Sequence, residues 1–226
     1  MVKIIADPGS CHMGRIDYAF ELIETAAHAG CDAIKFQLFK AQNVGAGNIQ
    51  LPREWWPDLC ARARSLGIEI SASAFDWDAV RLLIDSGAPW IKFSYSCRMS
   101  PNVQEAAKQI PVIVSCGPMD VAKLIYSGGS NWTTLFCVPE YPVLYDIDFS
   151  SIFHLFPFDG FSDHTLGFGQ TIGAVRAGAQ VIEKHITLDH PDIDCPDHAF
   201  ALHPKVLEDM VKVLRYRTGD VGRLIR

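Results

Sequence analysis

Hydrophobic and polar residues alternate along this chain in a pattern that changes period repeatedly. Apolar side chains recur at helical spacing in stretches such as 19–27 and 80–84. Four of the helical stretches end in glycine, at Gly30, Gly67, Gly87 and Gly178, and three of these glycines follow a small residue. An apolar segment rich in β-branched or aromatic residues follows each one. A glycine that ends a helix before a buried strand is typical of the αβ junctions of a parallel sheet.

The pattern predicts eight strands with helices between them. The strands are expected at residues 4–7, 33–37, 68–70, 90–93, 111–116, 133–138, 161–164 and 181–185. Eight such units favour a (β/α)₈ barrel, also called a TIM barrel, over an open doubly wound sheet, although roughly 28 residues per unit is compact for a fold that typically needs about 250. We expect one domain over residues 1–226. The longest expected loop, residues 40–57, holds Trp55 and Trp56, which should pack onto the barrel top or, less simply, cover a substrate.

Composition narrows the class of protein. With 49% hydrophobic residues the chain can build one large core, and a net charge of −6 argues against binding to nucleic acid. No apolar run approaches the length of a membrane span, and no leader segment is evident, so we expect a cytoplasmic protein. The seven cysteines form no C-x-x-C pair and are expected to be reduced core thiols.

Polar residues recur where the predicted strands end, which packing inside a barrel does not explain. They are Asp7, Lys35, Gln37, Ser73, Asp76, Lys92, Ser115, Glu140, Tyr141, Asp163, His164, Lys184 and His185. His164 and His185 end neighbouring strands and could together bind a divalent metal while leaving positions open for water and substrate. The alternative is that they only form hydrogen bonds at the barrel mouth.

Charged residues within apolar strands predict an anion site beside the histidines. Lysines are costly to bury without an anion, so Lys35, Lys92 and Lys184, with the hydroxyl of Ser115 or Ser162, could hold a phosphate and a carboxylate. The alternative is that these lysines form structural ion pairs. The carboxylates Asp7, Glu183 and Asp197 are candidates for proton transfer or hydroxyl binding, or they only balance the lysine charge.

Several motifs, in order along nearly the whole chain, resemble the sialic acid synthases (N-acetylneuraminate synthases) and their relatives. Residues 5–14, IADPGSCHMG, are similar to the family's I-A-E-I-G-x-N-H-x-G, and residues 32–40, DAIKFQLFK, to its A-D-A-V-K-F-Q-T-F-K. Residues 137–142, CVPEYP, also match, and the pair FSDHTLG at 161–167 and VIEKHITLD at 181–189 is highly specific.

The resemblance implies a phosphoenolpyruvate-dependent transferase that forms a carbon–carbon bond with an N-acyl amino sugar such as N-acetylmannosamine. By the match, His164 and His185 bind the metal, expected to be Mn²⁺ with Mg²⁺ or Co²⁺ as alternatives. Lys35, Lys92, Ser115 and Ser162 hold phosphoenolpyruvate, and Gln37, Tyr141, Glu183 and Asp197 face the sugar. Asp7 takes the place of a family glutamate, while Cys11, Tyr95 and Pro139 replace polar family residues.

Most members of that family add a C-terminal antifreeze-like domain that reaches into a partner subunit, whereas this sequence ends directly after its last expected barrel helix. Three explanations stay open: the sugar is bound differently, the chain is a minimal form, or the missing contacts come from another polypeptide, such as a homodimer partner or a separate antifreeze-like protein. Two other functions stay open: a Schiff-base aldolase with a barrel lysine as nucleophile, and a catalytically degenerate barrel that binds phosphate ligands.

Overall fold

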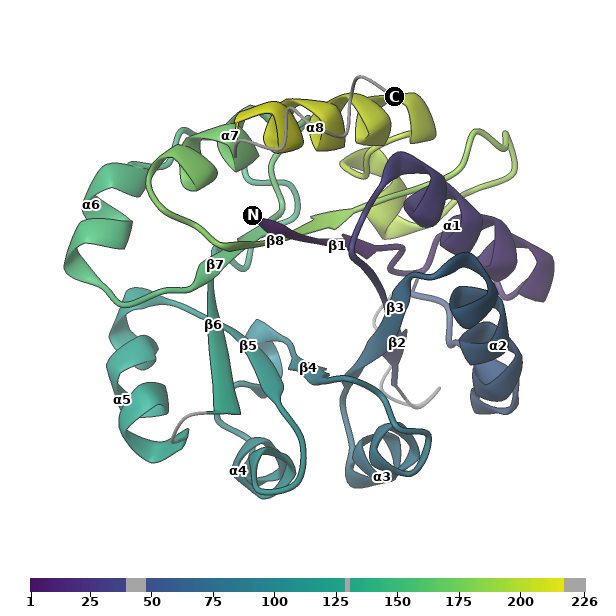
Figure 1. The fold of residues 1–226 in the computed structure, drawn as a ribbon, viewed down its shortest axis with the longest axis horizontal. Coiled ribbons are helices and arrows are strands. Elements are labelled where there is room, and N and C mark those ends of the chain that lie inside the picture. The colour runs from purple at the N-terminus through teal and green to yellow at the C-terminus, as the bar shows by residue number, and fades with distance from the viewer. Residues whose placement is uncertain (40–47, 129–130, 218–226) are drawn as a thin grey trace.

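The computed structural model describes the chain except for residues 40–47, 129–130 and 218–226. Parallel strands close into a barrel in chain order, with β8 hydrogen-bonded to β1 (Figure 1). The strands are β1 (Lys3–Asp7), β2 (Ala33–Leu38), β3 (Glu69–Ala74), β4 (Ile91–Phe93), β5 (Val112–Cys116), β6 (Trp132–Cys137), β7 (Gly160–Asp163) and β8 (Val181–His185). Each overlaps one of the eight predicted segments, so the predicted (β/α)₈ barrel is confirmed.

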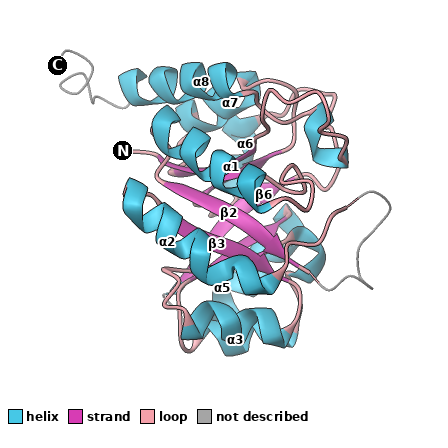
Figure 2. Ribbon diagram, turned by 90° about the vertical axis from the view of Figure 1, so that its right-hand side faces the viewer, coloured by secondary structure: helices cyan, strands magenta, loops and turns pink. Residues whose placement is uncertain are grey.

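Helices form the outer layer around the strands (Figure 2). They are α1 (Ile16–Ala29), α2 (Trp56–Leu66), α3 (Trp77–Asp85), α4 (Pro101–Ala107), α5 (Pro118–Gly128), α6 (Phe149–Leu155), α7 (Gly169–Arg176) and α8 (Pro204–Arg217), with short 3₁₀ turns η2 (Arg53–Trp55), η3 (Tyr95–Cys97) and η5 (Pro196–Ala199). The glycines predicted to end helices have the left-handed backbone this requires, with φ of 86° at Gly30 and 70° at Gly67.

The barrel interior is built in two layers because side chains two residues apart on a strand share a face. The lower layer is an apolar cluster of Ile5, Ala33, Trp90, Ile113 and Leu135, with Val181 packed against it. At Gly160 a Cβ would lie 2.0 Å from the Val181 carbonyl oxygen, so only glycine fits between β7 and β8. The residues two positions further along these strands form the upper layer, at the carboxyl ends of the strands.

The prediction of a single loop over residues 40–57 is wrong at its C-terminal end. Residues 40–47 lie outside the described residues, but η2 begins at Arg53 and α2 at Trp56, with Pro57 in the first turn of α2. Proline is favoured there because the first-turn N–H groups have no partner within the helix. Trp56 is buried in the core and donates to Ser86 Oγ at 2.9 Å, so it neither packs onto the barrel top, as expected, nor lines the cavity.

All seven cysteines are free thiols, and five of them are buried. Among the helices the structure describes, none is both long enough and apolar enough to cross a lipid bilayer.

Candidate active site

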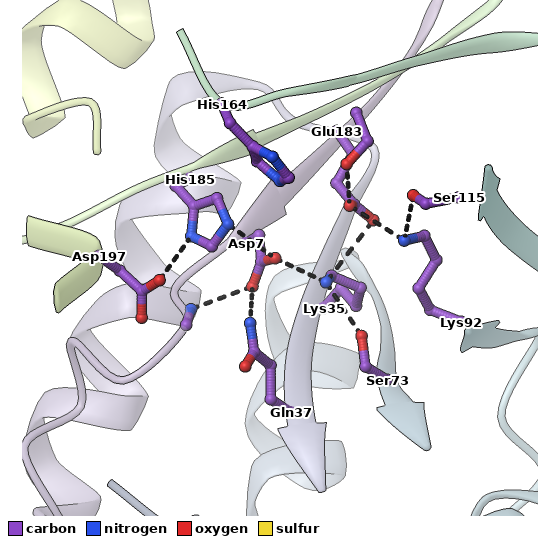
Figure 3. Close-up of polar contacts among 12 residues, drawn as sticks. Asp7, Lys35, Gln37, Ser73, Lys92, Ser115, His164, Glu183, His185 and Asp197 are labelled. Carbon is purple, nitrogen blue, oxygen red and sulfur yellow. Dashed lines mark hydrogen bonds and ion pairs between the residues drawn. The ribbon is translucent and has the colours of Figure 1, made fainter. Parts of the chain in front are cut away.

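The upper layer of the barrel surrounds a cavity of about 380 Å³. Eleven of the twelve site residues predicted from the sequence line it: Asp7, Lys35, Gln37, Lys92, Ser115, Tyr141, Ser162, His164, Glu183, His185 and Asp197. Strand register explains the gathering, because Asp7 pairs with His185 on the neighbouring strand and Ser162 pairs with Glu183. Asp7 and His185, from opposite ends of the sequence, therefore lie side by side at the same end of the barrel (Figure 3).

Lys184 is the exception, and its predicted contact with substrate is not supported. It alternates with Glu183 and His185 along β8, so its side chain points to the opposite face of the strand. Its ammonium lies 3.2 Å from Asp163 Oδ1 and also donates to the Thr165 carbonyl oxygen. Asp163 in turn accepts from the Thr171 hydroxyl on α7, so Lys184 belongs to a buried ion pair between barrel and helix layer.

The two cavity lysines are paired with the two inner carboxylates (Figure 3). Lys35 Nζ lies 2.6 Å from Asp7 Oδ2 and 3.6 Å from Glu183 Oε2, and it donates to Ser73 Oγ at 3.1 Å. Lys92 Nζ lies 3.2 Å from Glu183 Oε1 and donates to Ser115 Oγ at 2.7 Å. The ion pairs considered as an alternative are thus present, and they lie within the cavity.

Burial and charge act differently on the two lysines. Burial lowers the pKa of Lys35, but the charges of Asp7 and Glu183 outweigh burial and raise that pKa above its ordinary value. For Lys92, burial outweighs the attraction of Glu183, and the charge of Lys35 adds to it, so the pKa of Lys92 is lowered. Lys92 is therefore the cation that a bound anion would stabilise more.

The carboxylates stay ionised despite their burial. Burial raises the pKa of Asp7, but the charges of Lys35 and His185 outweigh it and hold that pKa well below its usual range. The pKa of Glu183 is also lowered, because Lys35 and Lys92 together outweigh its burial. With both lysines protonated, the four groups balance to zero net charge.

The two predicted metal-ligating imidazoles face each other at the mouth of the cavity, with ring centroids 5.6 Å apart (Figure 3). His164 Nδ1 lies 3.0 Å from the Val138 carbonyl oxygen, which can only accept, so Nδ1 carries the proton and Nε2 presents a lone pair. Burial lowers the pKa of His164 to about 3. This imidazole is neutral, as a metal ligand must be.

His185 is held between two carboxylates. Its Nε2 lies 3.4 Å from Asp7 Oδ2 and its Nδ1 lies 3.6 Å from Asp197 Oδ1. Among the described residues, three buried side-chain polar atoms have no hydrogen-bond partner, and two of them, His185 Nδ1 and Glu183 Oε2, belong to residues that line this cavity. Unsatisfied buried groups are costly, which indicates that the cavity is built around a polar ligand.

The donor chemistry fits a metal only in part. Within the described ranges, no three His, Cys, Asp or Glu side chains are grouped so that they could hold an ion on their own. Two facing imidazoles nevertheless suit Mn, Co or Zn when water or substrate oxygens supply the remaining positions. A metal held by His164 and His185 would therefore be open to substrate.

Asp197 is positioned by the segment that follows β1. Its Oδ2 accepts from the Ser10 backbone N–H at 2.8 Å. Gly9 has φ of 51°, and a Cβ there would lie 2.2 Å from the same carboxylate oxygen, so only glycine lets Asp197 approach this closely. The backbone N–H of Gly9 also donates to Asp7 Oδ1, so one turn orients both carboxylates.

Aromatic side chains that were not predicted as site residues complete the wall. Phe39 and Phe75 follow β2 and β3 directly and meet edge to face at 5.6 Å, and the ring of Phe200 lies 5.0 Å from that of His185. The sequence could have indicated Phe39 and Phe75 as cavity residues, because each is an apolar residue immediately after a strand. Phe200 follows the short turn η5 and not a strand, so its position in the sequence gives no indication that it lines the cavity.

The fold and the site together define a (β/α)₈ barrel whose cavity holds two buried lysines, paired with carboxylates, beside a pair of imidazoles. Residues 44–224 match the model of the NeuB family. The chain is 31% identical to an N,N'-diacetyllegionaminic acid synthase of Legionella pneumophila, over 94% of this chain and 71% of that protein.

Solved structures agree with the sequence match. The structure superposes on the N-acetylneuraminic acid (sialic acid) synthetase of Leptospira borgpetersenii with a TM-score of 0.85 and 27% identity, covering 100% of this chain and 87% of that one. It superposes on the spore coat polysaccharide biosynthesis protein spsE of Bacillus subtilis with a TM-score of 0.82 and 31% identity, covering 99% and 70%. The chain belongs to the NeuB family, and the resemblance inferred from its motifs is confirmed.

Proposed function

We propose that this protein condenses phosphoenolpyruvate with an open-chain N-acyl amino sugar, giving a nonulosonic acid and phosphate. The observation that carries the proposal is one cavity in which two buried lysines and two serine hydroxyls lie beside a neutral imidazole. Relatives named as synthases of legionaminic and neuraminic acids support the same chemistry with different sugars.

Phosphoenolpyruvate would occupy the lysine end of the cavity. Lys35 and Lys92 would supply positive charge, and Ser115 and Ser162 would supply hydroxyl donors to its phosphate and carboxylate. Because Asp7 and Glu183 already neutralise the lysines, the incoming anion must displace a carboxylate from a lysine or bring protons with it. In the second case, substrate binding is accompanied by proton uptake.

A divalent cation, expected to be Mn²⁺ with Mg²⁺ or Co²⁺ as alternatives, would be held by His164 and His185. When bound, it supplies Lewis-acid polarisation of the sugar aldehyde. Gln37, Tyr141 and Asp197 also line the cavity and would bind the hydroxyl and acyl groups of the sugar. These contacts orient the aldehyde carbon toward the lysine end.

The reaction balances with one added water. The methylene carbon of phosphoenolpyruvate attacks the aldehyde carbon, and the aldehyde oxygen takes a proton to become a hydroxyl. Water then adds to the former enol carbon and gives up a proton, for which Asp7 and Glu183 are the acceptors in reach. The hydroxyl left on that carbon then gives up its proton as the bond to the phosphate oxygen breaks, so that phosphate departs with this proton and the α-keto acid remains.

We also propose that a partner molecule covers the mouth of the cavity, where the sugar would bind, because apolar and aromatic side chains are exposed there. Tyr141 lines the cavity yet is 57% exposed, and Leu144 and Leu166 nearby along the adjoining loops are 75% and 56% exposed. We expect a second copy of the chain or a separate antifreeze-like protein to cover these side chains. Light scattering of the purified chain, alone and with candidate partners, would measure the assembly.

A Schiff-base aldolase is the second candidate, and the lowered pKa of Lys92 favours it because a neutral amine is the nucleophile. Borohydride with a keto-acid substrate would trap Lys92 covalently in an aldolase. A condensing synthase would show no such adduct.

The test is phosphate release from phosphoenolpyruvate with a panel of N-acyl amino sugars, with and without Mn²⁺ and with a chelator. We expect release that requires both a sugar and the metal. Release with no sugar dependence, or none with any sugar and metal, would contradict the proposal.

A further inference from the structure

Two thiols that belong to no part of the cavity wall meet behind Asp197. Cys11 Sγ and Cys195 Sγ are 3.2 Å apart although 184 positions separate them in the sequence. Both residues are buried, Cys11 completely and Cys195 with 8% of its surface exposed. Neither residue lines the cavity.

The pair spans the contact that positions Asp197. Cys11 directly follows Ser10, whose backbone N–H donates to Asp197 Oδ2, and Cys195 lies two positions before Asp197. One sulfur therefore belongs to the segment after β1, and the other belongs to the segment after β8. A bond between them would tie together the two segments that meet at this carboxylate.

The environment makes the two thiols unequal. A hydrogen bond from Cys11, with help from backbone N–H groups of His198 and Asp197, outweighs burial and lowers the pKa of Cys195. The same contact and burial raise the pKa of Cys11. Cys195 is thus the sulfur that becomes a thiolate more readily and attacks an oxidant, while Cys11 remains a thiol beside it.

We propose that Cys11 and Cys195 are an oxidation site, at which a peroxide converts the two thiols into a disulfide that locks the segments around Asp197. In the first step the Cys195 sulfur attacks one peroxide oxygen, the O–O bond breaks, and the other oxygen leaves as water after taking a proton. Cys195 is then a sulfenic acid. The Cys11 sulfur attacks it, the S–OH bond breaks, and the hydroxide takes the Cys11 proton to leave as a second water.

The geometry needs only a small movement. A disulfide bond is about 2.0 Å long, so the sulfurs must approach by about 1.2 Å. Disulfides in reducing compartments are commonly transient and redox-sensing, and an external dithiol would return this pair to the thiol form.

The test treats the full-length protein with hydrogen peroxide and maps the cysteines after trypsin digestion. We expect peptide 4–15 to be joined to peptide 185–205, and the count of free thiols to fall from seven by two. In the Cys11→Ser variant the cross-link is lost and dimedone captures a sulfenic acid on Cys195. Cys31→Ser is the matched control, because Cys31 is also 8% exposed and makes no thiol contact in the described residues; it should keep the cross-link.

Hydrogen exchange gives a readout that does not depend on the activity of the protein. After oxidation, exchange in residues 8–15 should slow, because opening of the Ser10–Asp197 contact is then opposed by a covalent link. The proposal is overturned if peroxide oxidises other cysteines without joining the two peptides. It is equally overturned if Cys195 yields as much dimedone adduct in the wild type as in Cys11→Ser.

Discussion

Replacing Lys92 by methionine should weaken phosphoenolpyruvate binding without unfolding the barrel. Lys92 is 2% exposed, and its ammonium contacts Ser115 Oγ at 2.7 Å and Glu183 Oε1 at 3.2 Å. A hydrogen bond from a buried cation to phosphate contributes about 1.5–3 kcal/mol, and methionine keeps the apolar stem but removes the charge. The expected loss of affinity is therefore roughly 10- to 150-fold.

The stability cost of this change should be moderate. Glu183 keeps Lys35 at 3.6 Å and a hydrogen bond from Ser162 at 2.8 Å, so its charge is not left without partners. We expect a loss of free energy of unfolding below the about 3–5 kcal/mol of a fully broken buried ion pair. Urea unfolding would measure this loss.

Lys184→Met is the matched control for affinity. Lys184 is equally buried and paired with a carboxylate, Asp163, but it lies outside the cavity. Lys184→Met should lower the free energy of unfolding, while the folded variant keeps the wild-type affinity for phosphoenolpyruvate. Calorimetric titration at fixed pH and ionic strength would compare both variants with the wild type. Unchanged affinity in Lys92→Met, or the same loss in both variants, would refute the placement of the phosphate.

Three further outcomes are expected. Because burial lowers the pKa of Lys92, its positive charge is lost as pH rises through that lowered pKa. A pH series should therefore show phosphoenolpyruvate affinity falling at a lower pH than an ordinary lysine would give. In Lys92→Arg, this fall in affinity should shift to higher pH. His164→Ala and His185→Ala should each lower Mn²⁺ affinity, measured by electron paramagnetic resonance, and wild-type affinity in both would contradict the metal site. Gly67→Ala should lower the free energy of unfolding by about 1–2 kcal/mol, because its backbone is left-handed. Gly9→Ala should lower it more, since its Cβ would also lie 2.2 Å from a carboxylate oxygen of Asp197. Equal losses in urea unfolding would contradict the close packing at Gly9.

The barrel was predictable because its signals are local. Each helix ending at Gly30 or Gly67 and each short buried strand is specified by neighbouring residues. Eight of the eleven cavity residues followed from one rule, that polar side chains at the ends of parallel strands gather at one end of the barrel. Ser162, Glu183 and Asp197 followed instead from the expected anion site and from the family resemblance. Lys184 was misplaced because the strict alternation of side chains along β8 was not applied to three consecutive polar residues.

Other features depend on contacts that no local pattern carries. The packing of Gly9 against Asp197 and the meeting of Cys11 with Cys195 join segments more than 180 residues apart. Only the closure of β8 onto β1 brings these segments together. The pairing of both cavity lysines with carboxylates likewise depends on side-chain directions across the barrel.

The central claim, that the cavity joins the methylene carbon of phosphoenolpyruvate to a sugar aldehyde, is tested most directly by ¹³C NMR with phosphoenolpyruvate labelled at that carbon. The protein would be incubated with Mn²⁺ and N-acyl amino sugars. The account predicts that the alkene signal is replaced by a saturated methylene bonded to a carbinol carbon, with one phosphate released per product. Phosphate released together with labelled pyruvate, or a persistent alkene signal with every sugar, would contradict it.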